Sequence, residues 1–268
     1  MTKDFFKPEP HVFAHRGLPL DYPENTMISF ENAVKLGVDV IETDAHLTKD
    51  NQFVICHDSE ISRISNGKGL IKDYTLKQLK EFDAAYNFSK DGGHTFPFRD
   101  RGITFVSVAE ILEKFPKQRF NIDLKDKNQK QVELWAELIK EYDAEHRILT
   151  ASQFTENLKE VRLKFPNMAT SFSAGEVFRF YLKNKFRGLK SLKKADFKGD
   201  ALQVPEKMFG MRIVSEKSIK RAHQLGFKIH VWTINNEKDM IRLLKLGVDG
   251  IFTDNAPLLK SILKKYKK

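Results

Sequence analysis

Residues 35–44 read KLGVDVIETD and residues 245–254 read KLGVDGIFTD, the same ten-residue phrase with eight positions unchanged. A looser copy, QLGFKIHVWT, covers residues 224–233. Each copy reads as the end of a helix, a glycine that accepts positive φ, a tight turn and a buried strand. Joints of this kind recur where strands and helices alternate along a parallel sheet. The repeat therefore predicts an α/β chain built from parallel βα units.

Elsewhere along the chain, short apolar runs resemble those in the repeated phrases. Together they predict eight barrel strands, most of them separated by amphipathic helical patterns. The strands are expected at residues 12–15, 39–44, 119–125, 147–151, 168–172, 201–204, 228–234 and 249–253. The first helix is expected at residues 26–36, with Asn25 as its N-cap. The predicted fold is a TIM (β/α)8 barrel, with residues 1–268 as one domain.

Residues 51–101 do not fit a simple βα unit. They contain one further apolar run at residues 53–57, followed by glycine-rich and polar segments. This stretch therefore predicts a small insertion after the second barrel strand, on the top face of the barrel.

The bulk composition is that of a globular protein and sets limits on partners. The chain has 268 residues, is 41% hydrophobic and carries a formal charge of +10. That charge suits nucleic acid, an anionic membrane surface or a phosphorylated substrate. Because no recognised nucleic-acid motif accompanies the charge, a nucleic-acid partner is not expected. The single cysteine, Cys56, permits no intrachain disulfide and is expected to be a small buried hydrophobe. With no apolar leader in residues 1–10 and no run of about 18 apolar residues, a cytoplasmic location is expected.

Polar clusters stand at the ends of four predicted strands. They are His15-Arg16-Gly17, Glu42-Thr43-Asp44, His57-Asp58 and Asn121-Ile122-Asp123-Leu124-Lys125. Because residues i and i+2 of a strand face the same way, Glu42 and Asp44 point together, and so do Asp123 and Lys125. Active sites of TIM barrels lie at the carboxyl ends of the strands. Two histidines, an arginine, a lysine and three of these carboxylates, Glu42, Asp44 and Asp123, predict a site for a phosphate ester at this face.

The residue types indicate what each group could do there. Three carboxylates favour a hard cation, Mg²⁺ or Ca²⁺. The alternative is an ordinary polar strand end, but the second copy of the repeat has Phe252 at the Glu42 position, where no ligand is needed. Arg16 offers a planar fork to a phosphate, and histidine, with a pKa near about 6.5, suits proton transfer at neutral pH. His230, beside Trp232, is expected to pack in the interior.

Several short motifs occur in a characteristic order between about His11 and Pro257. They are HRG with PENT downstream, ETD, HD followed by SRISNGKG, DLK, HVWTIN and DGIFTD. In this combination the chain resembles the glycerophosphodiester phosphodiesterases. The resemblance implies a TIM barrel with a small insertion after the second strand, and dependence on a divalent metal, usually Ca²⁺ or Mg²⁺.

Carried over position by position, the resemblance assigns roles to the strand-end residues. It implies Glu42, Asp44 and Asp123 as metal ligands, His15 and His57 as the catalytic acid/base pair, and Arg16 and Lys125 as phosphate-binding residues. Trp232 is a further candidate for contact with the substrate. The family usually has glutamate where this chain has Asp123. The shorter aspartate implies a metal closer to that strand or reached through water.

The implied activity is metal-dependent hydrolysis of a glycerophosphodiester to glycerol 3-phosphate and an alcohol. Two alternatives stay open: a lysophospholipase D acting on lysophospholipids, and a catalytically silent barrel that binds phospholipid headgroups. The silent barrel needs a missing site residue, and none is missing. Residues 177–198 interleave basic and aromatic side chains, which predicts either peripheral membrane contact or, preferred here, a solvated helix face.

Overall fold

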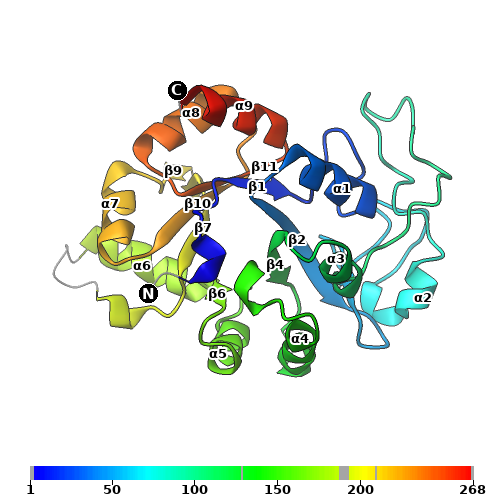
Figure 1. The fold of residues 1–268 in the computed structure, drawn as a ribbon, viewed down its shortest axis with the longest axis horizontal. Helices are drawn as coiled ribbons and strands as arrows, with labels where there is room; N and C mark the ends of the chain where they lie inside the picture. Colours follow the sequence, from blue (N-terminus) through cyan, green and yellow to red (C-terminus); the bar gives the residue numbers. More distant parts are fainter. Residues whose placement is uncertain (1–2, 128, 187–192, 209, 267–268) are drawn as a thin grey trace.

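The chain forms a closed parallel barrel (Figure 1). The computed structural model describes residues 3–127, 129–186, 193–208 and 210–266. The barrel strands follow the order β6-β5-β4-β2-β1-β11-β10-β7, and a parallel bridge between Ser171 and Ala201 joins the two ends of the sheet. Their bounds are β1 (Val12–His15), β2 (Val40–Leu47), β4 (Arg119–Leu124), β5 (Ile148–Ala151), β6 (Ala169–Thr170), β7 (Ala201–Pro205), β10 (Lys228–Trp232) and β11 (Gly250–Thr253). The predicted TIM barrel is confirmed.

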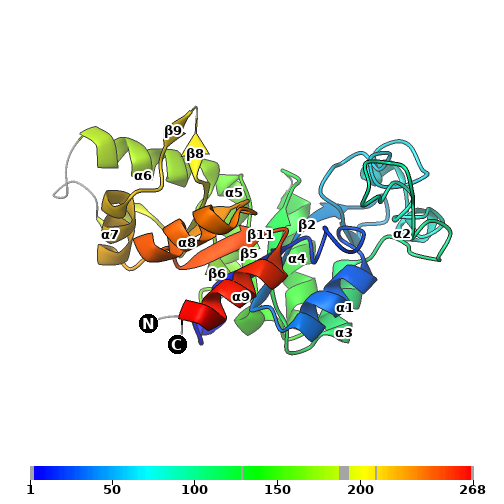
Figure 2. The same cartoon turned by 90° about the horizontal axis from the view of Figure 1, so that it is seen from above.

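Helices surround the sheet (Figures 1 and 2). They are α1 (Met27–Leu36), α3 (Val108–Lys114), α4 (Gln129–Glu141), α5 (Thr155–Lys164), α6 (Ala174–Phe186), α7 (Glu216–Gln224), α8 (Glu237–Leu246) and α9 (Ala256–Tyr266). The repeated phrase explains two of the joints, because Gly37 after α1 and Gly247 after α8 adopt φ of 74° and 87°. Glycine reaches this left-handed conformation without a steric cost from Cβ. The helix–glycine–strand interpretation of the repeat is thus confirmed.

The N-cap prediction for α1 is wrong by one residue. Thr26 is the cap, and its hydroxyl accepts a hydrogen bond from the Ser29 N–H. Asn25 instead turns to the barrel, where its amide oxygen accepts from the Thr43 hydroxyl at 2.8 Å. A tertiary partner on β2 therefore overrides the local preference of asparagine for the cap.

The lower end of the barrel, opposite the strand carboxyl ends, is filled with aromatic side chains. The short 3-10 helix η1 (Asp4–Phe6) buries Phe5 and Phe6 in a cluster that also contains Phe13 and Phe252 from the barrel interior. Arg119 binds the carbonyl oxygens of Phe5 and Pro8 and holds the segment in place. The polar side chains of the barrel interior are consequently concentrated at the opposite end, where the strands have their carboxyl ends.

The structure places His230 in this interior cluster, as expected. Its ring is fully buried, 4.5 Å from the Phe13 ring between centroids, and burial lowers its pKa to about 4. The unfolded chain, with an ordinary histidine pKa near 6.5, therefore binds the proton first as the pH falls.

We expect the free energy of unfolding to decrease by about 3 kcal/mol as the pH falls from about 6.5 to about 4, because of His230 alone. Urea unfolding of the wild type and of His230→Leu at pH 7 and pH 4.5 measures this contribution, since leucine does not titrate. A smaller pH dependence in the variant is the expected result. Equal pH dependence in the two proteins would contradict it.

The insertion follows the second barrel strand, as predicted. It begins with β3 (Phe53–Ile55), antiparallel to β2, and continues through η2 (Ile71–Asp73) and α2 (Leu76–Leu79). It encloses a hydrophobic cluster of its own, formed by Val54, Cys56, Ile61, Ile64, Ile71, Leu79, Ala84 and Phe105. In Figure 2 the insertion projects beyond the barrel, next to α1 and α3. The division of residues 1–268 into one domain with this insertion stays a prediction.

Across the described ranges, the helices fall short of the length and apolarity that crossing a bilayer requires.

Candidate active site

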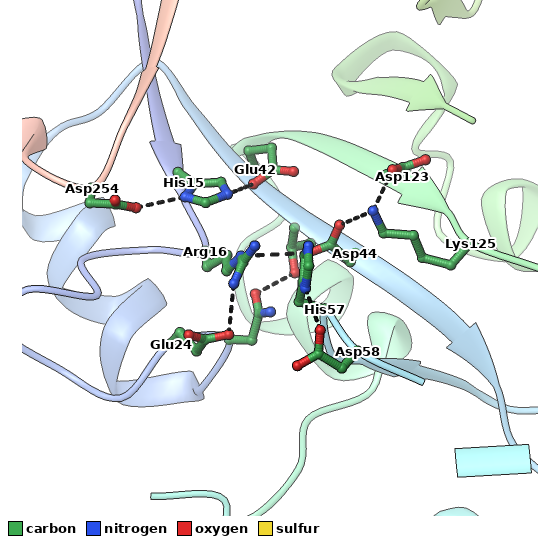
Figure 3. A network of polar contacts seen from close by, with 12 residues as sticks. His15, Arg16, Glu24, Glu42, Asp44, His57, Asp58, Asp123, Lys125 and Asp254 are labelled. Carbon is green, nitrogen blue, oxygen red and sulfur yellow. Dashed lines mark hydrogen bonds and ion pairs between the residues drawn. The ribbon is translucent and has the colours of Figure 1, made fainter. Parts of the chain in front are cut away.

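A cavity of about 630 Å³ opens at the carboxyl ends of the barrel strands. All of the residues predicted as site residues line it, namely His15, Arg16, Glu42, Asp44, His57, Asp123, Lys125 and Trp232. Strand register explains why residues so distant in sequence meet there. His15 on β1 lies beside Glu42 on β2, and Asp44 on β2 lies beside Asp123 on β4. The structure therefore brings together the groups that the strand-end pattern predicted, as Figure 3 shows.

His15 is held by a carboxylate that the sequence analysis did not single out. Its Nδ1 lies 2.6 Å from Asp254 Oδ1, and its Nε2 faces Glu42 Oε2 at 3.9 Å (Figure 3). Burial opposes protonation of His15, but the Asp254 hydrogen bond and the Glu42 charge together raise its pKa above the ordinary value. Asp254 thus orients the ring and stabilises the imidazolium that forms when Nε2 accepts a proton.

His57 repeats this arrangement with a different carboxylate. Its Nδ1 lies 2.7 Å from Asp58 Oδ1, and its side chain is 38% exposed at the mouth of the cavity. In both histidines the carboxylate occupies Nδ1, so that Nε2 remains available to a ligand. Two orienting carboxylates on two histidines of one cavity suit proton transfer in both directions.

Lys125 connects two of the predicted metal ligands. Its ammonium nitrogen lies 2.7 Å from Asp44 Oδ1 and 2.7 Å from Asp123 Oδ2. Burial works against the charge of Lys125, but these two carboxylates outweigh it and raise the pKa of the lysine. Burial also raises the pKa of Asp123. On the other side of Asp44, Arg16 Nε approaches Oδ2 at 3.9 Å. Two cations therefore flank Asp44 and present positive charge to the cavity.

The free oxygens of this cluster suit a hard cation. Among the described residues, none forms a hydrogen bond to the buried Glu42 Oε2 or Asp44 Oδ2, although His15 Nε2 and Arg16 Nε face them at 3.9 Å. Burial together with the Asp44 charge raises the pKa of Glu42 to about 7. Carboxylate oxygens that accept no hydrogen bond are donors of the kind that Mg²⁺ and Ca²⁺ prefer. In the described part of the chain, no three carboxylate, histidine or cysteine groups form a ready ligand set, and Asp123 is paired with Lys125. Glu42 and Asp44 therefore offer donors that suit such an ion, whereas Asp123 is held by Lys125.

One wall of the cavity is apolar, and local sequence patterns do not reveal it as a whole. It is formed by Phe172, Val177, Phe178, Tyr181, Met208, Ile213, Trp232 and Phe252. These residues come from β6 and its loop, from α6, from the hairpin of β8 (Lys207–Met208) and β9 (Met211–Arg212), and from β10 and β11. Aromatic residues at helical spacing also fit core packing, so local pattern does not distinguish the two. Asp254 did carry a usable signal, since it is the repeat counterpart of Asp44.

Fold and site together define a class of protein, the TIM-barrel hydrolases of phosphoric diesters. The family model described as "Glycerophosphoryl diester phosphodiesterase family" matches residues 15–258. The chain belongs to this family and is a phosphoric diester hydrolase.

Known relatives agree with the assignment. The chain is 32% identical to a glycerophosphodiester phosphodiesterase of Bacillus altitudinis, over 91% of this chain and 94% of the relative. It is 30% identical to one of Caldanaerobacter subterraneus subsp. tengcongensis, over 95% and 98% of the two chains. Among solved structures, it superposes with a TM-score of 0.74 on an Oleispira antarctica phosphodiesterase in complex with its product sn-glycerol-3-phosphate. That likeness covers 97% of this chain and 98% of the other at 23% identity, and supports the fold.

Proposed function

We propose that this hydrolase converts glycerophosphodiesters to glycerol 3-phosphate and an alcohol, with a divalent metal and a histidine acid/base pair. The observation that carries the proposal is the pair of carboxylate-oriented histidines, His15 on Asp254 and His57 on Asp58, facing one cavity with Arg16 and Lys125. Family membership supports the choice of substrate class. The silent-barrel alternative finds no support, because every predicted site residue lines the cavity.

In the proposed reaction His15 Nε2 accepts the proton of the attacking oxygen, which forms a new bond to phosphorus. This oxygen belongs to water, or to a hydroxyl of the substrate, in which case water afterwards opens the resulting cyclic phosphate to glycerol 3-phosphate. The phosphorus–oxygen bond to the alcohol breaks, and His57 Nε2 gives its proton to the departing oxygen. Asp254 and Asp58 stabilise the two imidazolium forms, while Arg16 and Lys125 bind the phosphate oxygens. Glu42 and Asp44, with Asp123, would hold Mg²⁺ or Ca²⁺, whose chemistry when bound is to polarise the phosphodiester.

Choline release from glycerophosphocholine tests the proposal directly. We expect release by the purified protein with Mg²⁺ or Ca²⁺, and loss of release in excess chelator that is restored by adding the metal back. Glycerol 3-phosphate should form in equal amount to choline, which verifies which bond is cleaved. Absence of release from several glycerophosphodiesters under all metal conditions would contradict the proposal.

A second candidate substrate is a lysophospholipid, and the apolar wall favours it. Small headgroup diesters offer little apolar surface for Phe178, Tyr181 and Ile213 to contact, whereas an acyl chain does. Phe178 is 66% exposed and stands on α6, next to Arg179. Peripheral membrane contact through residues 177–198 remains a prediction, and residues 187–192 of that segment lie outside the described ranges. A cytoplasmic location likewise remains a prediction.

Phe178→Ser separates the two substrates. We expect about a tenfold loss of kcat/KM for lysophosphatidylcholine, which corresponds to about 1.4 kcal/mol of lost apolar contact. For glycerophosphocholine we expect no change. Leu182→Ser is the matched control, since Leu182 is 44% exposed on the same helix but does not line the cavity. Equal rates of wild type and Phe178→Ser on the lysolipid would exclude this wall as an acyl-chain site.

A further inference from the structure

One arginine of the insertion connects the two halves of the active site. Arg63 donates from Nη1 to Glu24 Oε2 at 3.0 Å, from Nη2 to Glu24 Oε1 at 2.6 Å, and from Nε to Asp58 Oδ2. Asp58 is the carboxylate that orients His57. Glu24 also accepts from Arg16 Nη1 at 3.0 Å. A continuous chain of ion pairs therefore runs from His57 through Arg63 to Arg16; Figure 3 shows its two ends, His57 on Asp58 and Arg16 on Glu24.

We propose that Arg63 is a positioning residue that holds His57 and Arg16 in one fixed geometry. The inference rests on the proposed function, in which His57 protonates the leaving alcohol and Arg16 binds the phosphate. Through Asp58, Arg63 fixes the direction of the His57 ring. Through Glu24, it fixes the guanidinium of Arg16 against the cavity.

The chemistry of the contact requires arginine. A guanidinium presents donors on three nitrogens in a rigid plane, so it can satisfy Glu24 with two bonds and Asp58 with a third. A lysine in this place offers a single point charge and cannot fix both carboxylates. Hydrogen bonds and charges from Arg63 keep Glu24 and Asp58 ionised, because they lower both pKa values although burial raises them.

The exposure of Arg63 argues that its role is orientation rather than stability. Its side chain is 46% exposed, and exposed ion pairs contribute about 0–1 kcal/mol to folding. Glu24, by contrast, is only 19% exposed and is shared between Arg63 and Arg16. Loss of Arg63 leaves Glu24 to Arg16 alone, and leaves Asp58 free to rotate with His57.

The test compares two leaving groups, because an acid matters only when the leaving oxygen needs a proton. Choline leaves glycerophosphocholine as a poor leaving group, whereas p-nitrophenol leaves the p-nitrophenyl ester of glycerol 3-phosphate as a stable anion. For Arg63→Ala and Arg63→Lys we expect kcat on glycerophosphocholine to fall about 10- to 100-fold. The kcat on the nitrophenyl ester should change far less. KM should rise for both substrates, since Arg16 loses its alignment.

Two comparisons make the outcome decisive. Arg101→Ala, at an exposed arginine of the same insertion, should behave as wild type on both substrates. In the His57→Ala background, Arg63→Ala should cost no further kcat, because coupled residues are not additive. Thermal unfolding of each variant verifies the fold, and Arg63→Lys serves if Arg63→Ala does not fold.

Failure of the inference and failure of the proposed function give different results. If His57→Ala shows the leaving-group difference and the Arg63 variants slow both substrates equally, Arg63 does not position His57, and the inference that it holds both groups is overturned. If His57→Ala itself shows no leaving-group difference, the acid role of His57 fails and the inference fails with it.

Discussion

Replacement of His15 or His57 by alanine should lower kcat for glycerophosphocholine by about 10²- to 10⁴-fold, the range that general acid–base catalysis contributes. The two histidines stand on β1 and after β3, and each is oriented at Nδ1 by its own carboxylate. Alanine removes the proton acceptor in one case and the proton donor in the other. The fold should persist, since neither ring belongs to the hydrophobic clusters.

The controls for this prediction come from the same chain. His94→Ala, at an exposed histidine of the insertion, should keep the wild-type rate. Asp254→Asn should lower kcat less than His15→Ala, because the ring remains but loses its orienting charge. Rates like those of the wild type in both His15→Ala and His57→Ala would remove the acid/base scheme altogether.

The second large effect is expected at the carboxylates of β2. In wild-type protein, Mg²⁺ or Ca²⁺ at about 100 times its dissociation constant should raise the free energy of unfolding by about 3 kcal/mol. In Glu42→Gln and Asp44→Asn this gain should largely vanish, together with activity. The physical reason is that their unpartnered oxygens are the donors available to the ion.

Without metal, Glu42→Gln should raise the free energy of unfolding instead of lowering it. Glu42 is buried against the like charge of Asp44, so Glu42→Gln removes a repulsion and should unfold at higher urea than metal-free wild type at pH 8. Glu113→Gln, at an exposed carboxylate of α3, is the matched control and should alter neither measurement. If the metal raised the free energy of unfolding of both β2 variants as much as that of the wild type, the ion would bind elsewhere.

Local patterns in the sequence were sufficient for the scaffold. The glycines after α1 and α8 and the apolar runs after them depend on backbone conformation within a few residues, and both features appeared as predicted. Polar groups at strand ends were also recognisable, because a parallel barrel places all strand carboxyl ends at one face. Local pattern did not predict the role of Asn25, because its side chain contacts Thr43 on β2 instead of capping the helix.

Sequence patterns alone therefore predicted a TIM barrel with an insertion after its second strand, and a site of histidines, carboxylates and cations at the strand ends. Which charged group pairs with which became known from the three-dimensional arrangement alone. Asp254 reaches His15 across 239 positions, Lys125 lies between Asp44 and Asp123, and Arg63 joins Glu24 to Asp58. The apolar wall of α6 and the β8–β9 hairpin arises in the same way. Strand register and barrel closure set these distances, and neither is encoded in any local stretch of residues.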